Sequence, residues 1–339
     1  MQPQLPSTER RNFITTAASA LAATTVAFHT SQVRAQQPTP TAVSGDLAAS
    51  ASDSNSTKSN LRYCLNMSTI NSSKVPLREQ LQIASNAGYD AVELWLRDIE
   101  TYTKGGGALN DLRKELEDLG LGVDSAIAFG AWIVDDDQKR RAGLEQSKRD
   151  MDILRQIGGR RIAAPPVGAT NEAGLNLDRA AERYRALLEI GRSQEVVPQI
   201  ELWGFSKNLS TLAEVLYVAA AANDPDACLL LDVYHLYKGG NDFNNVGLIP
   251  AQKMHCLHMN DYPAEPQRAE ISDQHRVYPG DGVAPLTSIL QTLVAGGFDG
   301  TLSLELFNRS YWELAPQEVA NTGIARMKAA VALAGISEA

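Results

Sequence analysis

Short apolar runs alternate with longer amphipathic stretches along most of the chain, from Leu61 to near its C-terminus. The short runs are typical of buried β-strands, and the longer stretches repeat their apolar residues at the spacing of an α-helix. We therefore expect strands at 61–66, 90–95, 122–128, 160–165, 197–203, 227–233, 253–260 and 300–306. The expected helices are 77–87, 109–119, 140–157, 178–193, 209–222, 286–295 and 317–333.

This order of elements predicts a fold of the α/β class. Strands that alternate with helices form a parallel sheet, and about eight such units fit a (β/α)8 TIM barrel. An open, doubly wound sheet is the alternative. It is disfavoured because no Gly-x-Gly-x-x-Gly motif follows the first expected strand.

The first 35 residues have the features of an export signal. Arg10 and Arg11 precede a weakly apolar stretch rich in Ala and Thr, and 33–35 fit a cleavage site. The paired arginines resemble the twin-arginine (Tat) class, which predicts a periplasmic protein; an ordinary N-terminal helix is the alternative. Residues 36–60 hold few large apolar side chains, so we expect a disordered linker before one catalytic domain at 61–339.

The charge of the chain narrows the range of partners. Its formal net charge is -9, and the leader carries three arginines against one glutamate, so the mature chain is more acidic still. A protein this acidic is not expected to have the basic surface that binds nucleic acid. No stable membrane anchor is expected either. Cys64, Cys228 and Cys256 each lie in an apolar run, which favours buried thiols; a bridge between the last two is the disfavoured alternative.

Alternation within each strand predicts which side chains face the barrel interior. Along 301–306 the leucines share one face, which must meet the helices, so Glu305 faces inward near the C-terminal end of the strand. The same argument sets His255 on the helix side of its strand. It places several other polar or aromatic side chains inside, near strand ends: Glu93, Trp95, Glu201, Trp203, Asp232 and His258.

Four of these inward residues can bind a metal, namely Glu201, Asp232, His258 and Glu305. The C-terminal mouth of a barrel is where active sites are built, and carboxylates buried together need a compensating cation. Three carboxylates and an imidazole favour Mn²⁺, with Mg²⁺, Co²⁺, Fe²⁺ or Zn²⁺ as alternatives. Carboxylates that each pair with a separate Arg or Lys are the other interpretation.

At these positions the chain resembles the sugar phosphate isomerase/epimerase superfamily, the xylose isomerase-like barrels. The matching segments are Ile200-Glu201-Leu202-Trp203, Leu231-Asp232-Val233-Tyr234-His235, His258-Met259-Asn260-Asp261, Arg276-Val277-Tyr278-Pro279-Gly280-Asp281-Gly282 and Leu304-Glu305. The resemblance implies that Glu201, Asp232, His258 and Glu305 bind the metal and that Glu201 and Glu305 also move protons. It further implies that His235 and Arg276 contact substrate oxygens.

We therefore expect a metal-dependent isomerase or epimerase of a ketose or keto-sugar that acts through an enediolate. Glu93, Trp95 and Trp203 are further candidates for substrate contacts, although Trp95 fits the core equally well. Export favours an unphosphorylated sugar. The alternatives are a dehydratase of the inosose or dehydroshikimate type and a non-catalytic sugar-binding barrel; an apurinic endonuclease is disfavoured by the acidic charge. The sequence leaves open whether the protein is a homo-oligomer.

Overall fold

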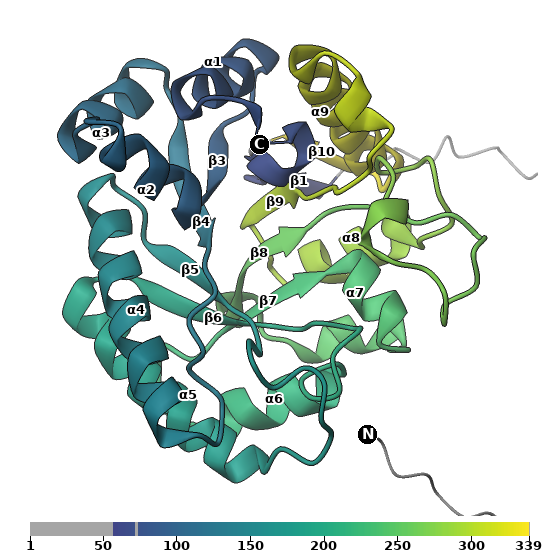
Figure 1. Cartoon of the computed structure of the whole chain (residues 1–339). Helices are drawn as coiled ribbons and strands as arrows, with labels where there is room; N and C mark the ends of the chain where they lie inside the picture. Colours follow the sequence, from purple (N-terminus) through teal and green to yellow (C-terminus); the bar gives the residue numbers. More distant parts are fainter. Residues whose placement is uncertain (1–56, 72–73, 339) are drawn as a thin grey trace, which may run out of the picture. The chain divides into compact units, whose positions relative to one another are not determined.

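The structure is a computed structural model that describes residues 57–71 and 74–338, so the expected leader and most of the expected linker lie outside the described residues. Within this part, parallel strands form a nearly closed barrel surrounded by helices (Figure 1). Each expected strand is confirmed. The barrel strands are β2 (Arg62–Asn66), β3 (Ala91–Trp95), β4 (Gly122–Ile127), β5 (Arg161–Ala164), β6 (Val197–Glu201), β7 (Leu229–Asp232), β8 (Met254–His258) and β9 (Thr301–Leu304).

The strand order around the barrel is β4-β3-β2-β9-β8-β7-β6-β5, and all hydrogen-bonded neighbours are parallel. The expected TIM barrel is therefore confirmed over the open sheet. Asp232 lies opposite His258 in the ladder between β7 and β8, and His258 lies opposite Ser303 in the ladder between β8 and β9. This register brings the carboxyl ends of the three strands to the same level at the mouth.

The seven expected helices are present, with ends that shift by up to a few residues. They are α1 (Leu77–Ala87), α3 (Leu109–Asp118), α4 (Asp137–Gln156), α5 (Leu177–Gln194), α6 (Leu212–Ala221), α8 (Leu286–Ala295) and α9 (Pro316–Leu333). The chain also forms α2 (Leu96–Lys104) and α7 (Val233–Lys238), which were not expected. Short 3-10 helices are η1 (Met67–Ile70), η3 (Phe243–Leu248), η4 (Ala251–Lys253), η5 (Asp273–His275) and η6 (Tyr311–Glu313).

The α7 helix explains why the expected strand 227–233 ends one residue early. The side chain of Asp232 accepts a hydrogen bond from the backbone N–H of His235. This N-cap contact starts the helix directly after Asp232. A helix of six residues is too short to produce a helical repeat in the sequence.

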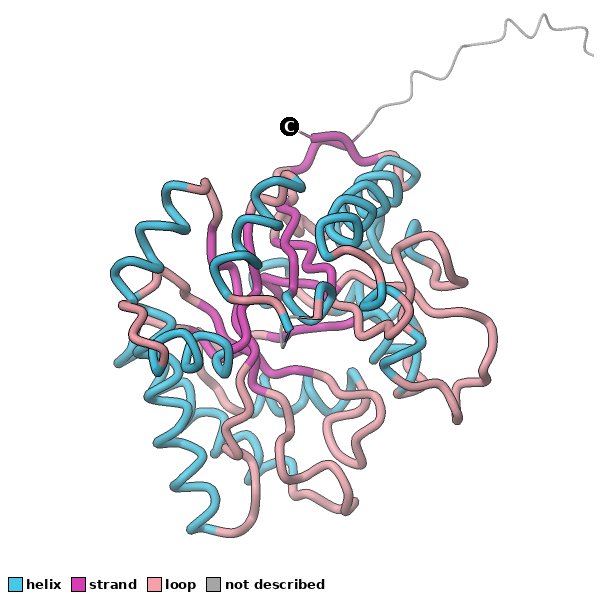
Figure 2. Tube along the Cα trace, turned by 45° about the horizontal axis from the view of Figure 1, so that its top comes forward, coloured by secondary structure: helices cyan, strands magenta, loops and turns pink. Residues whose placement is uncertain are grey.

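A separate pair of strands joins the two ends of the described chain. β1 (Thr57–Ser59) pairs in parallel with β10 (Ile336–Glu338), apart from the barrel sheet (Figure 2). The expectation of a linker up to residue 60 is therefore wrong for its last residues, because backbone pairing with the C-terminal strand orders them. In this described part of the chain, no helix combines the length and apolar character that a membrane crossing requires.

The barrel interior is polar, whereas the apolar core lies between the strands and the helices. Inside, Thr301 donates to Asp124 and Gln199 donates to Ser125. The three cysteines are buried free thiols, as expected. Burial raises the pKa of Cys228 to about 12, so its thiol stays protonated and unreactive at neutral pH.

Asp150 on α4 carries a buried carboxyl, and its Oδ2 has no hydrogen-bond partner among the described residues. Burial, with a smaller effect of Glu100, raises the pKa of Asp150 to about 6. The folded state thus binds a proton more tightly than the unfolded state, so ionisation costs stability as the pH rises from about 4 to above 6. Asp150→Asn should stabilise the fold by about 2 kcal/mol at pH 7. Urea unfolding at pH 4 and pH 7 tests this, and an equal gain at both values would contradict it.

Candidate active site

Three of the four expected metal ligands converge at the mouth of the barrel. Glu201 ends β6, His258 ends β8, and Glu305 directly follows β9. Each offers one ligand atom, and these atoms lie within 4.8 Å of one another. All three residues are buried. The distance from His258 Nδ1 to Glu305 Oε2 is 3.1 Å.

Asp232, the fourth expected ligand, lies beside this group but is bound by protein donors. Its Oδ1 accepts the backbone N–H of His235. Its Oδ2 accepts from Asn260 Nδ2 at 2.9 Å and from Arg276 Nη1 at 2.7 Å, and lies 3.6 Å from His258 Nδ1. Burial opposes ionisation, yet the positive charge of Arg276 holds the pKa of Asp232 well below its ordinary value. Asp232 is therefore an ionised carboxylate next to the candidate metal position.

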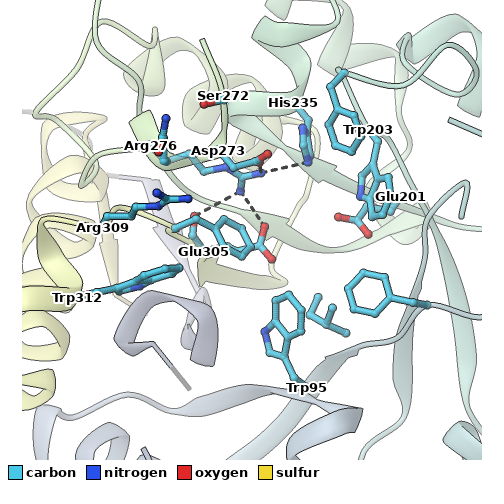
Figure 3. A pocket seen from close by; sticks show the side chains of 15 residues that line it. Trp95, Glu201, Trp203, His235, Ser272, Asp273, Arg276, Glu305, Arg309 and Trp312 are labelled. Carbon is cyan, nitrogen blue, oxygen red and sulfur yellow. Dashed lines mark hydrogen bonds and ion pairs between the residues drawn. The ribbon is translucent and has the colours of Figure 1, made fainter. Parts of the chain in front are cut away.

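Arg276 is the buried cation of the site. Its Nη1 also donates to Glu305 Oε2 at 2.8 Å, and its Nη2 contacts Asp273 at 2.6 Å and His235 Nε2 at 3.1 Å (Figure 3). A guanidinium group can only donate, so His235 must accept at Nε2 and carry its proton on Nδ1. Burial, and the charge of Arg276, lower the pKa of His235, which agrees with a neutral imidazole. Arg276 therefore forms ion pairs with two of the buried carboxylates, Asp232 and Glu305. This agrees in part with the alternative interpretation, in which each carboxylate pairs with an Arg or Lys.

Glu201 has a different environment from Asp232. Burial raises the pKa of Glu201 to about 8, and the neighbouring carboxylates of Glu305 and Asp232 add to the effect. No arginine or lysine forms an ion pair with Glu201 among the described residues. In the absence of a cation, Glu201 therefore holds a proton at neutral pH.

The donor set fits a divalent cation. His258 Nδ1 is buried and makes no hydrogen bond within the described residues, although it faces two carboxylates. Despite burial, the charges of Glu305 and Glu93 raise the pKa of His258, so a cation would replace the Nδ1 proton. The lone pair of a neutral imidazole together with carboxylate oxygens is a common ligand set for such an ion. A cation at this position would use the unpartnered nitrogen and offset the carboxylate charges. Glu201, His258 and Glu305 would hold it, with Asp232 next to them.

Glu93, which the sequence analysis expected to contact substrate, lies behind His258 and does not line the pocket. Its Oε2 is 3.0 Å from His258 Nε2. The same oxygen accepts from Asn66 Nδ2 and from Ser303 Oγ, both at 2.8 Å. Despite burial, the interaction with His258 lowers the pKa of Glu93. The structure therefore places Glu93 beneath the candidate metal position.

The site opens into a cavity of about 480 Å³. Trp95, Trp203, His235 and Arg276 line it, as the sequence analysis expected. Several other lining residues were not expected at the site, namely Ile127, Phe129, Ser272, Asp273, Gln274, Phe307, Arg309 and Trp312. Most of these lie in loops after strands, where no periodic pattern marks them. Asn66 was also missed, although the alternation that selected Glu305 places it on the inner face of β2.

Fold and site together define a (β/α)8-barrel protein with a carboxylate–histidine site at the carboxyl ends of its strands. Residues 81–330 match the family model of the xylose isomerase-like TIM barrel. The chain belongs to this family, which confirms the resemblance stated from the sequence.

Relatives with several activities are similar to this chain. It is 26% identical to a 3-dehydroshikimate dehydratase of Pseudomonas aeruginosa over 69% of its length, but spans only 37% of that protein. It is 24% identical to an inosose isomerase of Bacillus licheniformis, with 77% of this chain and 95% of the relative covered. The names of these relatives are those of enzymes with two different activities, a dehydratase and an isomerase.

Solved structures show the same fold. IOLI protein with a bound zinc atom superimposes with a TM-score of 0.74 at 20% identity, covering 80% of this chain and 99% of the other. L-ribulose 3-epimerase superimposes with a TM-score of 0.65 at 20% identity, covering 81% and 95%.

Proposed function

We propose that the protein is a divalent-metal-dependent isomerase or epimerase of a ketose or keto-sugar. The observation that carries this proposal is the group of Glu201, His258 and Glu305, with an unpartnered His258 Nδ1 facing the carboxylates. Inosose isomerases, a fructoselysine 3-epimerase and an L-ribulose 3-epimerase among the similar proteins agree with it.

Two carboxylates at the mouth are placed to exchange a proton with substrate. Glu201 ends β6 and Glu305 follows β9, and these strands are separated in the barrel by β7 and β8. The two side chains therefore reach the pocket from different sides, and both line it. One carboxylate can remove the proton from the carbon between a carbonyl and a hydroxyl, and the other can return it to the opposite face.

The remaining residues hold charge and orient the substrate. A divalent cation would polarise the carbonyl and the neighbouring hydroxyl and so acidify the C–H bond between them. Arg276 and His235 lie at the pocket wall, where Arg276 fixes the Glu305 carboxylate. His235 lines the pocket, and its Nδ1 has no hydrogen-bond partner among the described residues. Trp95 and Trp203 line the apolar side of the pocket.

Metal removal tests the proposal. A panel of unphosphorylated ketoses and keto-sugars is incubated with the protein in D₂O and read by NMR and mass spectrometry. Treatment with a chelator should abolish hydrogen exchange at the carbon next to the carbonyl, and Mn²⁺ or Co²⁺ should restore it. Exchange that persists at full rate after verified metal removal would contradict the metal-dependent reaction.

A dehydratase is the second candidate, because 3-dehydroshikimate dehydratases are among the similar sequences. It would begin with the same proton abstraction and then expel a hydroxyl group from the next carbon. The mass of the product separates the two reactions, since a dehydratase product is lighter by one water and an isomerase product is unchanged.

Export is part of the proposal and rests on the paired arginines at positions 10 and 11. An exported enzyme would meet unphosphorylated sugars, so the panel contains no sugar phosphates. Fractionation of cells that express the full chain, compared with a variant in which both arginines are replaced by lysine, tests this part separately.

A further inference from the structure

The aromatic residues of the chain are unevenly distributed between the core and the pocket. The sequence contains four tryptophans, and three of them, Trp95, Trp203 and Trp312, line the cavity. Phe129, Phe205 and Phe307 line it as well, whereas none of the ten tyrosines does. The wall is therefore built from rings without hydroxyl groups. Such rings offer apolar faces for stacking.

Four of these rings form a continuous arc along one side of the pocket. The ring centroids of Trp95 and Phe129 are 5.5 Å apart, those of Phe129 and Trp203 are 6.3 Å apart, and those of Trp203 and Phe205 are 5.2 Å apart. Contacts of this kind hold each ring in place through its neighbour. The arc begins near the candidate metal position, where Trp95 Nε1 donates to Asn66 Oδ1.

Two rings of the arc are open to solvent. Trp95 is only 7% exposed, but Phe129 is 38% exposed and Phe205 is 45% exposed. A phenyl ring left in water forgoes the stabilisation that burial would give, and large apolar groups gathered at a pocket mouth are typical of ligand sites. Trp95 is buried and Trp203 is half-buried, so Phe129 and Phe205 are the rings most available to a ligand.

Polar groups occupy the parts of the pocket that the arc leaves free. The carboxylates of Glu201 and Glu305 lie at the inner end, and Arg309, Gln274 and Ser272 line the rim. Figure 3 shows Arg309 across the pocket from Trp203. A sugar ring has the matching character, since its C–H face is apolar and its edge carries hydroxyl groups.

The size of the cavity agrees with a ligand larger than one sugar. Its volume of about 480 Å³ falls within the range of about 300–1,000 Å³ that is typical of pockets for drug-sized ligands. A sugar held at the inner carboxylates would leave the exposed faces of Phe129 and Phe205 uncovered.

We propose that the pocket recognises a glycoside with two sugar rings. The keto-sugar unit occupies the inner end at Glu201 and Glu305, and the second sugar ring stacks on Phe129 and Phe205. The hydroxyl edge of the second ring faces the rim residues Gln274 and Arg309. This inference rests on the proposed function, because it assigns the inner end to the reacting sugar.

Binding of unreactive glycosides to the Mn²⁺-loaded protein tests the proposal by calorimetry. The one-ring probes are methyl glucosides, galactosides and mannosides of both anomers. The two-ring probes are methyl cellobioside, methyl maltoside, methyl lactoside, sucrose and trehalose, which have no free carbonyl and cannot be isomerised. At least one two-ring probe should bind about tenfold more tightly than the best one-ring probe, as expected for one or two added stacking contacts.

The variants Phe129→Ala and Phe205→Ala should reduce this preference, and the double variant should bring it to within about twofold. The affinity for Mn²⁺ should stay unchanged, because neither Phe129 nor Phe205 belongs to the group of candidate metal ligands. Tyr217→Ala is the matched control, since Tyr217 is 46% exposed on α6 and lies outside the pocket. It should keep the full preference.

The proposal is overturned if the intact protein binds one-ring and two-ring probes equally or binds neither. A preference that survives in the double variant would also overturn it. The result is separable from that of the proposed function, which fails if no carbonyl sugar of the panel exchanges hydrogen with D₂O or if the exchange does not depend on metal. Probe binding needs no turnover, so either idea can fail alone.

Discussion

Replacing Glu201 by glutamine should lower kcat/KM for the best sugar of the panel by about 10³-fold, the range typical of a lost general acid or base. Glutamine keeps the size of the side chain but can neither accept nor return a proton. The fold should tolerate the change, because burial already favours the neutral form of Glu201 and raises its pKa to about 8. Glu305→Gln should cause a comparable loss, and its single oxygen cannot accept the hydrogen bonds of both Arg276 and Asn66.

Hydrogen exchange in D₂O at saturating Mn²⁺ separates a lost proton-transfer step from weakened metal binding. The double variant, Glu201→Gln with Glu305→Gln, should show no exchange above the background without protein. Glu189→Gln, an exposed residue of α5, is the matched control and should retain full activity. Substantial activity in the double variant at saturating metal would rule out the assigned roles of both carboxylates.

Much of this site could be predicted because the barrel imposes a simple rule on each strand. Side chains alternate between two faces, and the carboxyl ends of all strands meet at one mouth. This rule placed Glu201, His258 and Glu305 together before any contact was known, and the structure brings their ligand atoms within 4.8 Å. The same rule places Asn66, at the end of β2, on the inner face. It was not predicted to belong to the site because its side chain is an amide.

The rule says nothing about loops, and this explains what the sequence did not show. The contact between Asp232 and Arg276 joins residues 44 positions apart, and Arg276 follows a 3-10 helix in a long loop. Phe129, Phe205 and Arg309 also lie outside strands, so no periodicity predicts the direction of their side chains. The sequence thus predicted the inner half of the pocket better than its rim.

Glu93→Gln should weaken metal binding by about 10- to 100-fold, which is typical for the loss of a group that orients a metal-binding histidine. Glu93 accepts hydrogen bonds from Asn66 and Ser303 and contacts His258 Nε2. An ionised carboxylate can only accept, so it keeps a proton on His258 Nε2, and a cation would then bind at Nδ1. His258 Nε2 bonds to Oε1 of Glu93 at 3.2 Å, whereas Asn66 and Ser303 donate to Oε2. Glutamine has one accepting oxygen and one donating NH₂ group, so it must turn a donor toward at least one of these three donors.

Titration with Zn²⁺ and Mn²⁺ in competition with a chelator measures the affinity. Two-bond ¹⁵N–¹H spectra of histidine-labelled protein with Zn²⁺ report the tautomer of His258, a signal that a merely destabilised fold would not change selectively. Ser303→Ala removes one donor to Glu93 but leaves the contact with His258, so it should reduce metal affinity less than Glu93→Gln does. If Glu93→Gln binds Zn²⁺ as tightly as the unmodified protein and keeps the Nε2–H tautomer, Glu93 does not position His258.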